Sequence, residues 1–502
     1  MKSKILLLSI LIFPLMFSCN MKDLGNYNYI DEETAMPVRI ADLENTTGIR
    51  GSNLKIEPVF ELLQNEGKYE YEWYAIALGS TLRYDLSNQK NLDIELKLAG
   101  DTYSLCYKVI DPEKDLFVFK RATLTVTESP VTFGWYLVKD DNISVTDLDY
   151  YDRDSGEKTE NVLGRDGKQL EGIGRSFWYN NSHWHQVRNE DGTTTVLSRQ
   201  RAYHIVTDRD IKTFNAANWE VWKNFNDHFF ANTEPSNVLF QNISGYLYII
   251  NNSQPYALYN MMSNIGKVIP KLGEFNMVNG MIVTEEGMVM FDKNVNKFCS
   301  SGASGTAVSY PNFSTLSDSF DPVKEDKITC LNIYSGQIGG MTSNGYAVLQ
   351  NTEDPSIHYL VRMNVTYGGL SRPLVSIRDI PADSKLLKAK VVAVPPAALC
   401  LYFAEGNKLY VHKDNDLDLS LREVVLKEFP EGEEITYIGR IAQTSATYPP
   451  VFTHLVVATN KDGKYKIYRF NFDGSNPEII PTPVDESMSG DGYVRAAGYR
   501  AS

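Results

Sequence analysis

The stretch Ser244-Gly245-Tyr246-Leu247-Tyr248-Ile249-Ile250 places a tight-turn dipeptide beside a run of apolar residues. Gly accepts the positive φ that a two-residue hairpin turn requires, and aromatic and β-branched residues favour strands. The arrangement recurs at intervals of roughly 40 to 60 residues, the spacing of propeller blades. The other six turns are Asp140-Asp141-Asn142, Asp191-Gly192, Glu286-Gly287, Asn344-Gly345, Gly406-Asn407 and Asp462-Gly463.

Seven such hairpins predict that residues 131–502 form a β-propeller with seven blades. A single hairpin cannot bury both of its faces, whereas a closed ring of blades does so without leaving exposed sheet edges. Two stacked sandwiches are the alternative, and they predict no such period.

One segment interrupts the strand pattern. From Asp208 to Phe230, apolar residues are spaced by three, four and seven, which is typical of an amphipathic helix. Thr207 and Asp208 are suitable N-caps for it. The pattern predicts a helical insertion near 208–230, between the second and third blades.

Residues 37–128 have a different pattern of apolar and polar residues. Tyr69, Tyr71 and Trp73 alternate with glutamates, and a second alternating run from Tyr103 to Val109 stops at Asp111-Pro112. Several short strands around a central Trp are typical of an immunoglobulin-like sandwich. The proline of Thr127-Glu128-Ser129-Pro130 cannot donate to a sheet, so the boundary between the two regions is expected there.

Residues 1–18 have the composition of an export signal. Lys2 and Lys4 precede a thirteen-residue apolar run that ends at Phe17. This run is shorter than the roughly 20 residues that span a bilayer. Cys19 directly follows a small residue, as in a bacterial lipobox, which predicts lipidation of Cys19 and a tether over residues 19–36. Plain secretion, with Cys19 just beyond the cleavage site, is the alternative.

The overall charge excludes some partners. The chain has 502 residues, enough for two or three domains, and its net charge is −14. That sign disfavours nucleic acid and direct polybasic docking on a membrane, so membrane attachment is expected through the lipid. The remaining cysteines, Cys106, Cys299, Cys330 and Cys400, are too few for a disulfide framework and are expected as buried thiols, although one disulfide stays open.

No catalytic motif is present in the sequence. A nucleophile elbow, a His-Glu-x-x-His pair and a phosphate-binding glycine loop are all missing, and the carboxylates are scattered. We therefore expect no catalytic residues, no metal and no cofactor other than the N-terminal lipid. Propeller glycosidases place their acids on separate blades, so an enzyme remains an alternative.

Four of the six tryptophans lie within 45 residues. Aromatic rings flanked by Asn and His suit stacking on a sugar, gripping a peptide or contacting a partner protein. They also suit the core of a blade. His183 and His185, two apart on one strand, are a weak metal pattern without a third ligand. The candidate ligand or partner residues are Trp178, Tyr179, Trp184, Trp219 and Trp222.

Two acid-rich turns, Asp147 to Gly156 and Asp414-Asn415-Asp416, offer carboxylate oxygens to Ca²⁺. Their spacing does not match an EF-hand loop, so ordinary exposed turns are the favoured interpretation.

The N-terminal region resembles the PKD-like surface lipoproteins of Bacteroidota. The resemblance rests on the run from Cys19 to Tyr29, the Glu72-Trp73-Tyr74 strand, the Tyr103–Val109 strand and the crossing from Ser129 to Trp135. It implies a PKD-like module followed by a larger β-rich domain. Lys22 and Asp23 resemble the tag that directs such lipoproteins to the outer face of the outer membrane.

The resemblance also implies partners, namely a SusC/SusD-like transporter pair and other surface lipoproteins. The leading hypothesis is therefore a non-enzymatic surface lipoprotein that assists TonB-dependent uptake of a glycan or peptide. One alternative is a propeller-fold glycoside hydrolase or polysaccharide lyase at the cell surface. The other is a structural or adhesive surface protein without a small ligand.

Overall fold

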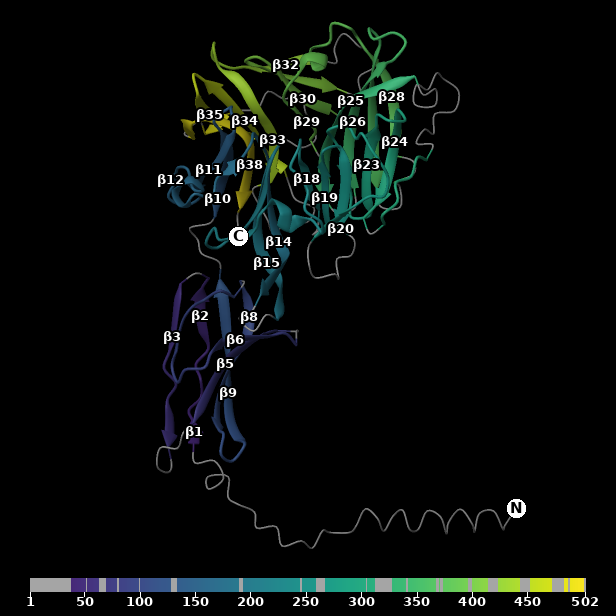
Figure 1. The fold of residues 1–502 in the computed structure, drawn as a ribbon. Coiled ribbons are helices and arrows are strands. Elements are labelled where there is room, and N and C mark those ends of the chain that lie inside the picture. The colour runs from purple at the N-terminus through teal and green to yellow at the C-terminus, as the bar shows by residue number, and fades with distance from the viewer. Residues whose placement is uncertain are drawn as a thin grey trace, which may run out of the picture. The chain divides into compact units, whose positions relative to one another are not determined.

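The computed structural model describes residues 38–500, except for 51, 63–68, 79–80, 99, 128–132, 189–192, 244–245, 259–266, 304, 312–326, 340–341, 367–369, 371–372, 396–399, 414–422, 443–451, 472–482 and 486–487. Contacts divide the chain after Thr127 into two compact units. Figure 1 shows both units as all-β structures. The predicted signal peptide, tether and Cys19, with Lys22 and Asp23, lie outside the described residues.

The first unit is a β-sandwich. One sheet has the strand order β2 (Thr46–Ile49), β9 (Leu116–Thr127), β8 (Asp101–Asp111), β5 (Glu70–Ala77) and β6 (Arg83–Ser87). Two strand pairs complete it, β3 (Asn53–Ile56) with β7 (Leu92–Glu95) and β1 (Val38–Ile40) with β4 (Phe60–Leu62). Trp73 is buried and stacks on Tyr107 with ring centroids 4.3 Å apart. The predicted immunoglobulin-like sandwich is confirmed.

The second unit contains seven sheets among its described residues, which we call the first to the seventh blade. In the first blade the order is β12 (Lys158–Thr159), β11 (Val145–Asp152), β10 (Gly134–Asp140) and β38 (Tyr493–Arg500), with β13 (Leu170–Glu171) beside β11. The second is β14 (Gly174–Arg188), β15 (Thr194–Thr207), β16 (Ile211–Asn215) and β17 (Val221–Lys223). The third is β18 (Leu239–Ile243), β19 (Tyr246–Asn251), β20 (Gln254–Leu258) and β21 (Val268–Pro270).

The remaining four blades follow in chain order. The fourth is β22 (Ile282–Val283), β23 (Gly287–Asp292) and β24 (Lys297–Gly302). The fifth is β25 (Ile328–Gly339), β26 (Thr342–Asn351), β27 (His358–Thr366) and β28 (Leu374–Ile380). The sixth is β29 (Val392–Ala393), β30 (Cys400–Glu405), β31 (Lys408–Lys413) and β32 (Glu423–Glu428). The seventh is β33 (Glu434–Ala442), β34 (Phe452–Lys461), β35 (Lys464–Asn471) and β36 (Pro483–Asp485), with β37 (Ser489–Asp491) beside β35.

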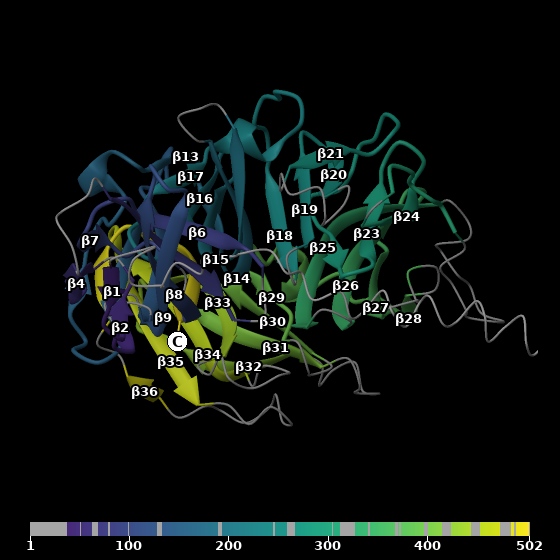
Figure 2. The same ribbon diagram turned by 90° about the horizontal axis from the view of Figure 1, so that it is seen from below.

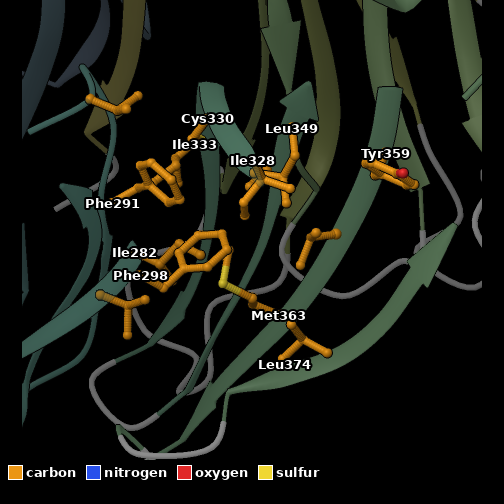
Figure 3. Packing of buried hydrophobic residues seen from close by; sticks show 14 of the residues in the cluster. Ile282, Phe291, Phe298, Ile328, Cys330, Ile333, Leu349, Tyr359, Met363 and Leu374 are labelled. Atoms are coloured by element: carbon orange, nitrogen blue, oxygen red, sulfur yellow. The ribbon is translucent and has the colours of Figure 1, made fainter. Parts of the chain in front are cut away.

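The blades form a closed ring because a separate apolar core fills each of the seven interfaces between neighbours. Figure 2 shows the blades following one another in chain order around a common centre. The core between the fourth and fifth blades includes Phe291, Phe298, Ile333 and Met363 (Figure 3). Since a packed core requires partners on both sides, a ring leaves no blade with a bare face.

The first blade is built from both ends of the unit. The C-terminal strand β38 pairs with β10, so that Gly134 faces Arg500. The Arg495 guanidinium donates to the Asp140 carboxylate at 2.9 Å. The same carboxylate accepts a hydrogen bond from the backbone N–H of Gly174, at the start of the second blade. These contacts close the ring, and the predicted seven-bladed propeller is confirmed.

The turns that the sequence indicated and that lie in the described residues belong to different blades. The Asp462-Gly463 turn joins β34 to β35, with positive φ at both residues. Asp191-Gly192 and Ser244-Gly245 lie outside the described residues. The turn predicted at Asn344-Gly345 is wrong, because both residues lie inside β26 and pair with β25 and β27. Gly345 is required there because a Cβ would meet the side chain of Ile282.

The helical insertion predicted near 208–230 is wrong. The segment contains β16, β17 and the single 3-10 turn η3 (Phe225–His228). The Thr207 hydroxyl accepts the backbone N–H groups of Arg209 and Asp210, so it caps a tight turn instead of a helix. β16 is buried on both faces, so its apolar and polar residues do not alternate as they do in a half-exposed strand. The remaining spacing of apolar residues resembles that of a helix.

The described residues include no helix long and apolar enough to cross a bilayer. Cys106, Cys299, Cys330 and Cys400 are all buried free thiols. Burial raises the pKa of the Cys299 and Cys330 thiols.

Candidate functional site

A cavity of about 460 Å³ opens between the first and second blades. Its floor is aromatic, formed by Tyr136 and Tyr150 of the first blade and Trp219 of the second. Its rim is polar and carries Asp152, Glu157, Arg165, Asp166 and Asn218. The volume lies within the range of small-molecule sites, and the lining combines an aromatic floor with a polar rim.

Turn chemistry builds the rim. The Asp152 carboxylate accepts hydrogen bonds from the backbone N–H groups of Asp154 and Ser155, which fixes the turn between β11 and β12. Arg165 and Asp166 lie on the 3-10 turn η2 (Gly164–Asp166), which ends at Gly167 with a φ of 67°. That left-handed conformation suits a glycine. The rim is therefore set by local hydrogen bonds.

Trp219 has an unusual backbone. Its φ is 60°, whereas the other non-glycine residues with positive φ in the described chain are Asn, Asp or Ser. A bulky residue rarely adopts this conformation, which costs about 1–3 kcal/mol and persists where the surroundings enforce it. Here the Trp219 N–H donates to the Asn215 carbonyl, and the indole stacks on Tyr203 at 4.9 Å. Strain of this kind is concentrated at functional sites.

A buried network supports the floor. The hydroxyls of Tyr136 and Tyr203 are 2.6 Å apart, and the Arg500 guanidinium donates to the Tyr203 hydroxyl at 2.9 Å. Arg500 also lies over the ring of Tyr179, 5.0 Å from its centroid. Burial raises the pKa of Tyr136 well above its ordinary value, so its hydroxyl stays protonated. The C-terminal strand that closes the ring thus also holds the pocket floor.

Hydrogen bonds and an ion pair hold several of the charged groups of the rim. Partial burial of Asp152 opposes ionisation, but hydrogen bonds from Ser155 and Asp154 outweigh it and hold the pKa of this carboxyl below its usual value. Asp166 forms an ion pair with Lys168 at 2.8 Å. The Nε of Arg165 donates to the Glu160 carbonyl at 3.2 Å.

The five aromatic residues that the sequence singled out lie in different places in the structure. Trp219 lines the pocket, and Tyr179 packs in the same core, behind the floor. Trp178 packs in the next core and donates its indole N–H to Ser176. Trp222 stacks on His185 with centroids 4.1 Å apart, and Trp184 is 39% exposed on β14. The five residues do not form one surface.

The second blade contains a histidine cluster that the sequence only partly indicated. His183 and His185 both stack on Trp222, as expected for one strand face. His204 and His228 join them, bridged by the Thr213 hydroxyl at 2.9 and 3.2 Å. No group of three His, Cys, Asp or Glu residues within the described ranges is placed to hold a metal ion.

Sequence reasoning missed most of the pocket. Tyr150, Glu157 and Arg165 were not singled out, although the acid-rich turn from Asp147 to Gly156 was noted as a possible Ca²⁺ loop. In the structure Asp147 accepts the N–H groups of Leu163 and Gly164, and Asp152 holds its own turn. The turn is thus an ordinary one that forms part of the rim. The second acidic turn, at 414–416, lies outside the described residues.

Comparison with protein families identifies a match to the N-terminal part of the chain. The model of the PKD-like family matches residues 20–172. This range contains the sandwich and also β10 to β13, so it extends into the first blade. Most of the pocket rim, including Asp152, Glu157 and Arg165, lies inside it. No curated protein sequence matches the chain.

Among solved structures, a quinonprotein alcohol dehydrogenase-like protein from Bacteroides thetaiotaomicron is 13% identical, with a TM-score of 0.36 over 89% of this chain and 96% of that one. The Nup133 β-propeller of Vanderwaltozyma polyspora is 10% identical, with a TM-score of 0.32 over 66% and 92% of the two chains. The extracellular domain of a putative one-component system from B. thetaiotaomicron is 10% identical, with a TM-score of 0.25 over 81% and 52%. These identities and TM-scores are too low to support an argument, so the propeller fold is established by the seven sheets of this chain.

Proposed function

We propose that this chain is a lipid-anchored protein of the outer membrane that faces the cell exterior. There it acts as an accessory binding component of a SusC/SusD-like TonB-dependent uptake complex. Its ligand, a glycan or a peptide, binds in the pocket beside Trp219. The observation that carries the proposal is the strained Trp219 in the aromatic floor of a polar-rimmed cavity.

The pocket favours binding over catalysis. Hydrolysis by a carboxylate pair requires two acids that are both available to the substrate. Asp152 is held by its own turn and Asp166 by Lys168, which leaves Glu157 as the rim carboxylate without such a partner in the described chain. The proposed membrane anchor and uptake complex are supported by the N-terminal sequence and by the PKD-like match.

Two measurements test the binding function. Titration calorimetry with glycan and peptide panels should give a ligand whose affinity falls about tenfold or more in Trp219→Ala. Trp184→Ala is the matched control, because it removes the same ring from the surface of β14, and its affinity should stay within about twofold. Equal losses in both variants, or turnover of the ligand by the wild type, contradict the proposal.

Localisation and partners are tested separately. Cys19→Ala should move the protein from the membrane fraction to the soluble fraction, and protease added to intact cells should degrade the wild type. Purification of the wild type in mild detergent should recover a SusC/SusD-like pair. A protein that stays in the cell interior, or one that purifies alone from cells that express such a pair, excludes the accessory role.

A further inference from the structure

The rim of the pocket carries two charged groups of opposite sign that have no ion-pair partner in the described part of the chain. In the described part of the chain, the Glu157 carboxylate has no hydrogen bond or ion pair, and Arg165 uses its Nε alone, on the Glu160 carbonyl. Both side chains are exposed to solvent at the mouth of the cavity. The rim therefore presents a strong acceptor and a strong donor to the same ligand.

The two groups select for ligand groups that both donate and accept. A ligand with a single net charge pairs with one of them and is repelled by the other. A hydroxyl donates to a carboxylate and accepts from a guanidinium, so neighbouring hydroxyls serve both without any charge. The additional ionised carboxylate of Asp152 makes the rim unfavourable for an anion.

The floor adds a flat apolar surface. Trp219 is half-buried, and one side of its indole stacks on Tyr203 at 4.9 Å. Its left-handed backbone places a rigid aromatic ring at the cavity, where a polar turn residue is usual. A ring that is apolar on its faces and polar around its edge matches a flat aromatic floor with a polar rim.

We propose that the pocket takes an uncharged sugar ring, stacked on Trp219, with neighbouring hydroxyls shared between Glu157 and Arg165. The inference rests on the proposed function and narrows its ligand from a glycan or peptide to a neutral glycan. It predicts that uronate-containing glycans and peptides are poor ligands, and that binding is insensitive to salt because no net charge is neutralised.

The experiment uses the detergent-solubilised full chain. The probes are neutral oligosaccharides of glucose, mannose, galactose and xylose, an oligogalacturonate and a peptide pool. We expect at least one neutral sugar to bind, with about tenfold loss in Trp219→Ala and about three- to tenfold losses in Glu157→Gln and Arg165→Gln. Glu171→Gln, at the exposed position of β13, is the control and should leave affinity unchanged.

Salt gives a second measurement. Raising NaCl from about 0.05 to 0.5 M should change the affinity for the neutral sugar by less than about twofold. If the uronate or the peptides bind in a Trp219-dependent way and no neutral sugar does, the sugar assignment is overturned and the proposed function is retained. Absence of Trp219-dependent binding to every probe overturns both.

Discussion

Lys139 and Asp149 form an ion pair 2.8 Å long, and their side chains are 6% and 0% exposed. Lys139 lies on β10 and Asp149 on β11, and the Tyr465 hydroxyl of the seventh blade donates to the same carboxylate at 2.7 Å. The pair therefore lies at the interface where the last blade meets the first. A buried charge that loses its partner is costly, so this interface should depend on both residues.

Lys139→Met should lower the free energy of unfolding of the propeller by about 1–3 kcal/mol, because the buried Asp149 carboxylate loses its closer cation and keeps only Lys158, at 3.6 Å. Urea unfolding followed by tryptophan fluorescence measures this, since five of the six tryptophans lie beyond residue 130. Lys55→Met, which breaks an exposed pair with Asp93 in the sandwich, should leave the midpoint unchanged. A loss below about 1 kcal/mol for Lys139→Met contradicts the prediction.

The propeller should lose stability as the pH falls from 6.5 toward 3. Burial, followed by the nearby Lys223 charge, lowers the pKa of His204 to about 3 and holds those of His183 and His228 well below 6.5. Below pH 6.5 the unfolded chain therefore binds protons that the folded chain does not, so stability is full above pH 6.5 and declines in acid.

Urea unfolding between pH 7.5 and 4.5 measures this slope, and His204→Phe should reduce it. The sandwich is an internal control, because residues 38–127 contain no histidine. An unchanged slope in His204→Phe, or an equal slope for the sandwich, would falsify the assignment to the histidine cluster.

Gly463→Ala should destabilise the propeller by about 1 kcal/mol. Gly463 has a φ of 78° in the hairpin between β34 and β35, and a Cβ there meets no atom within 4 Å, so the cost comes from the backbone alone. Gly305 also has open space at Cβ but is not among the positive-φ glycines. Gly305→Ala should therefore be neutral or slightly stabilising, and thermal unfolding compares the two. Equal effects contradict the prediction.

Deletion of residues 493–502 should prevent the propeller from forming a cooperative structure. Without β38, the inner edge of β10 is unpaired and the cores on both sides of the first blade lose Val494 and Ala496. We expect the sandwich to keep its protease resistance while the rest of the chain is degraded. A truncated chain whose propeller resists protease as the wild type does shows that closure by β38 is dispensable.

The fold was largely predictable because its causes are local. Turns such as Asp462-Gly463 and alternating strands such as β8 carry their conformation in a few neighbouring residues. The helical prediction failed for β16, because a strand buried on both faces has no alternation to detect. The pocket was hidden for another reason, since Arg165 of the first blade and Trp219 of the second line one cavity only because the two blades pack together.

The pairing of β10 with β38 also sets the order in which the molecule is completed. Arg495 and Asp140 are 355 residues apart in the chain, and a contact over such a separation forms late. A chain that emerges from its N-terminus can finish the sandwich early, but the first blade must wait for the synthesis of β38. Because Arg500 supports Tyr203 beneath the pocket floor, the pocket takes its shape only after residue 500 has been synthesised.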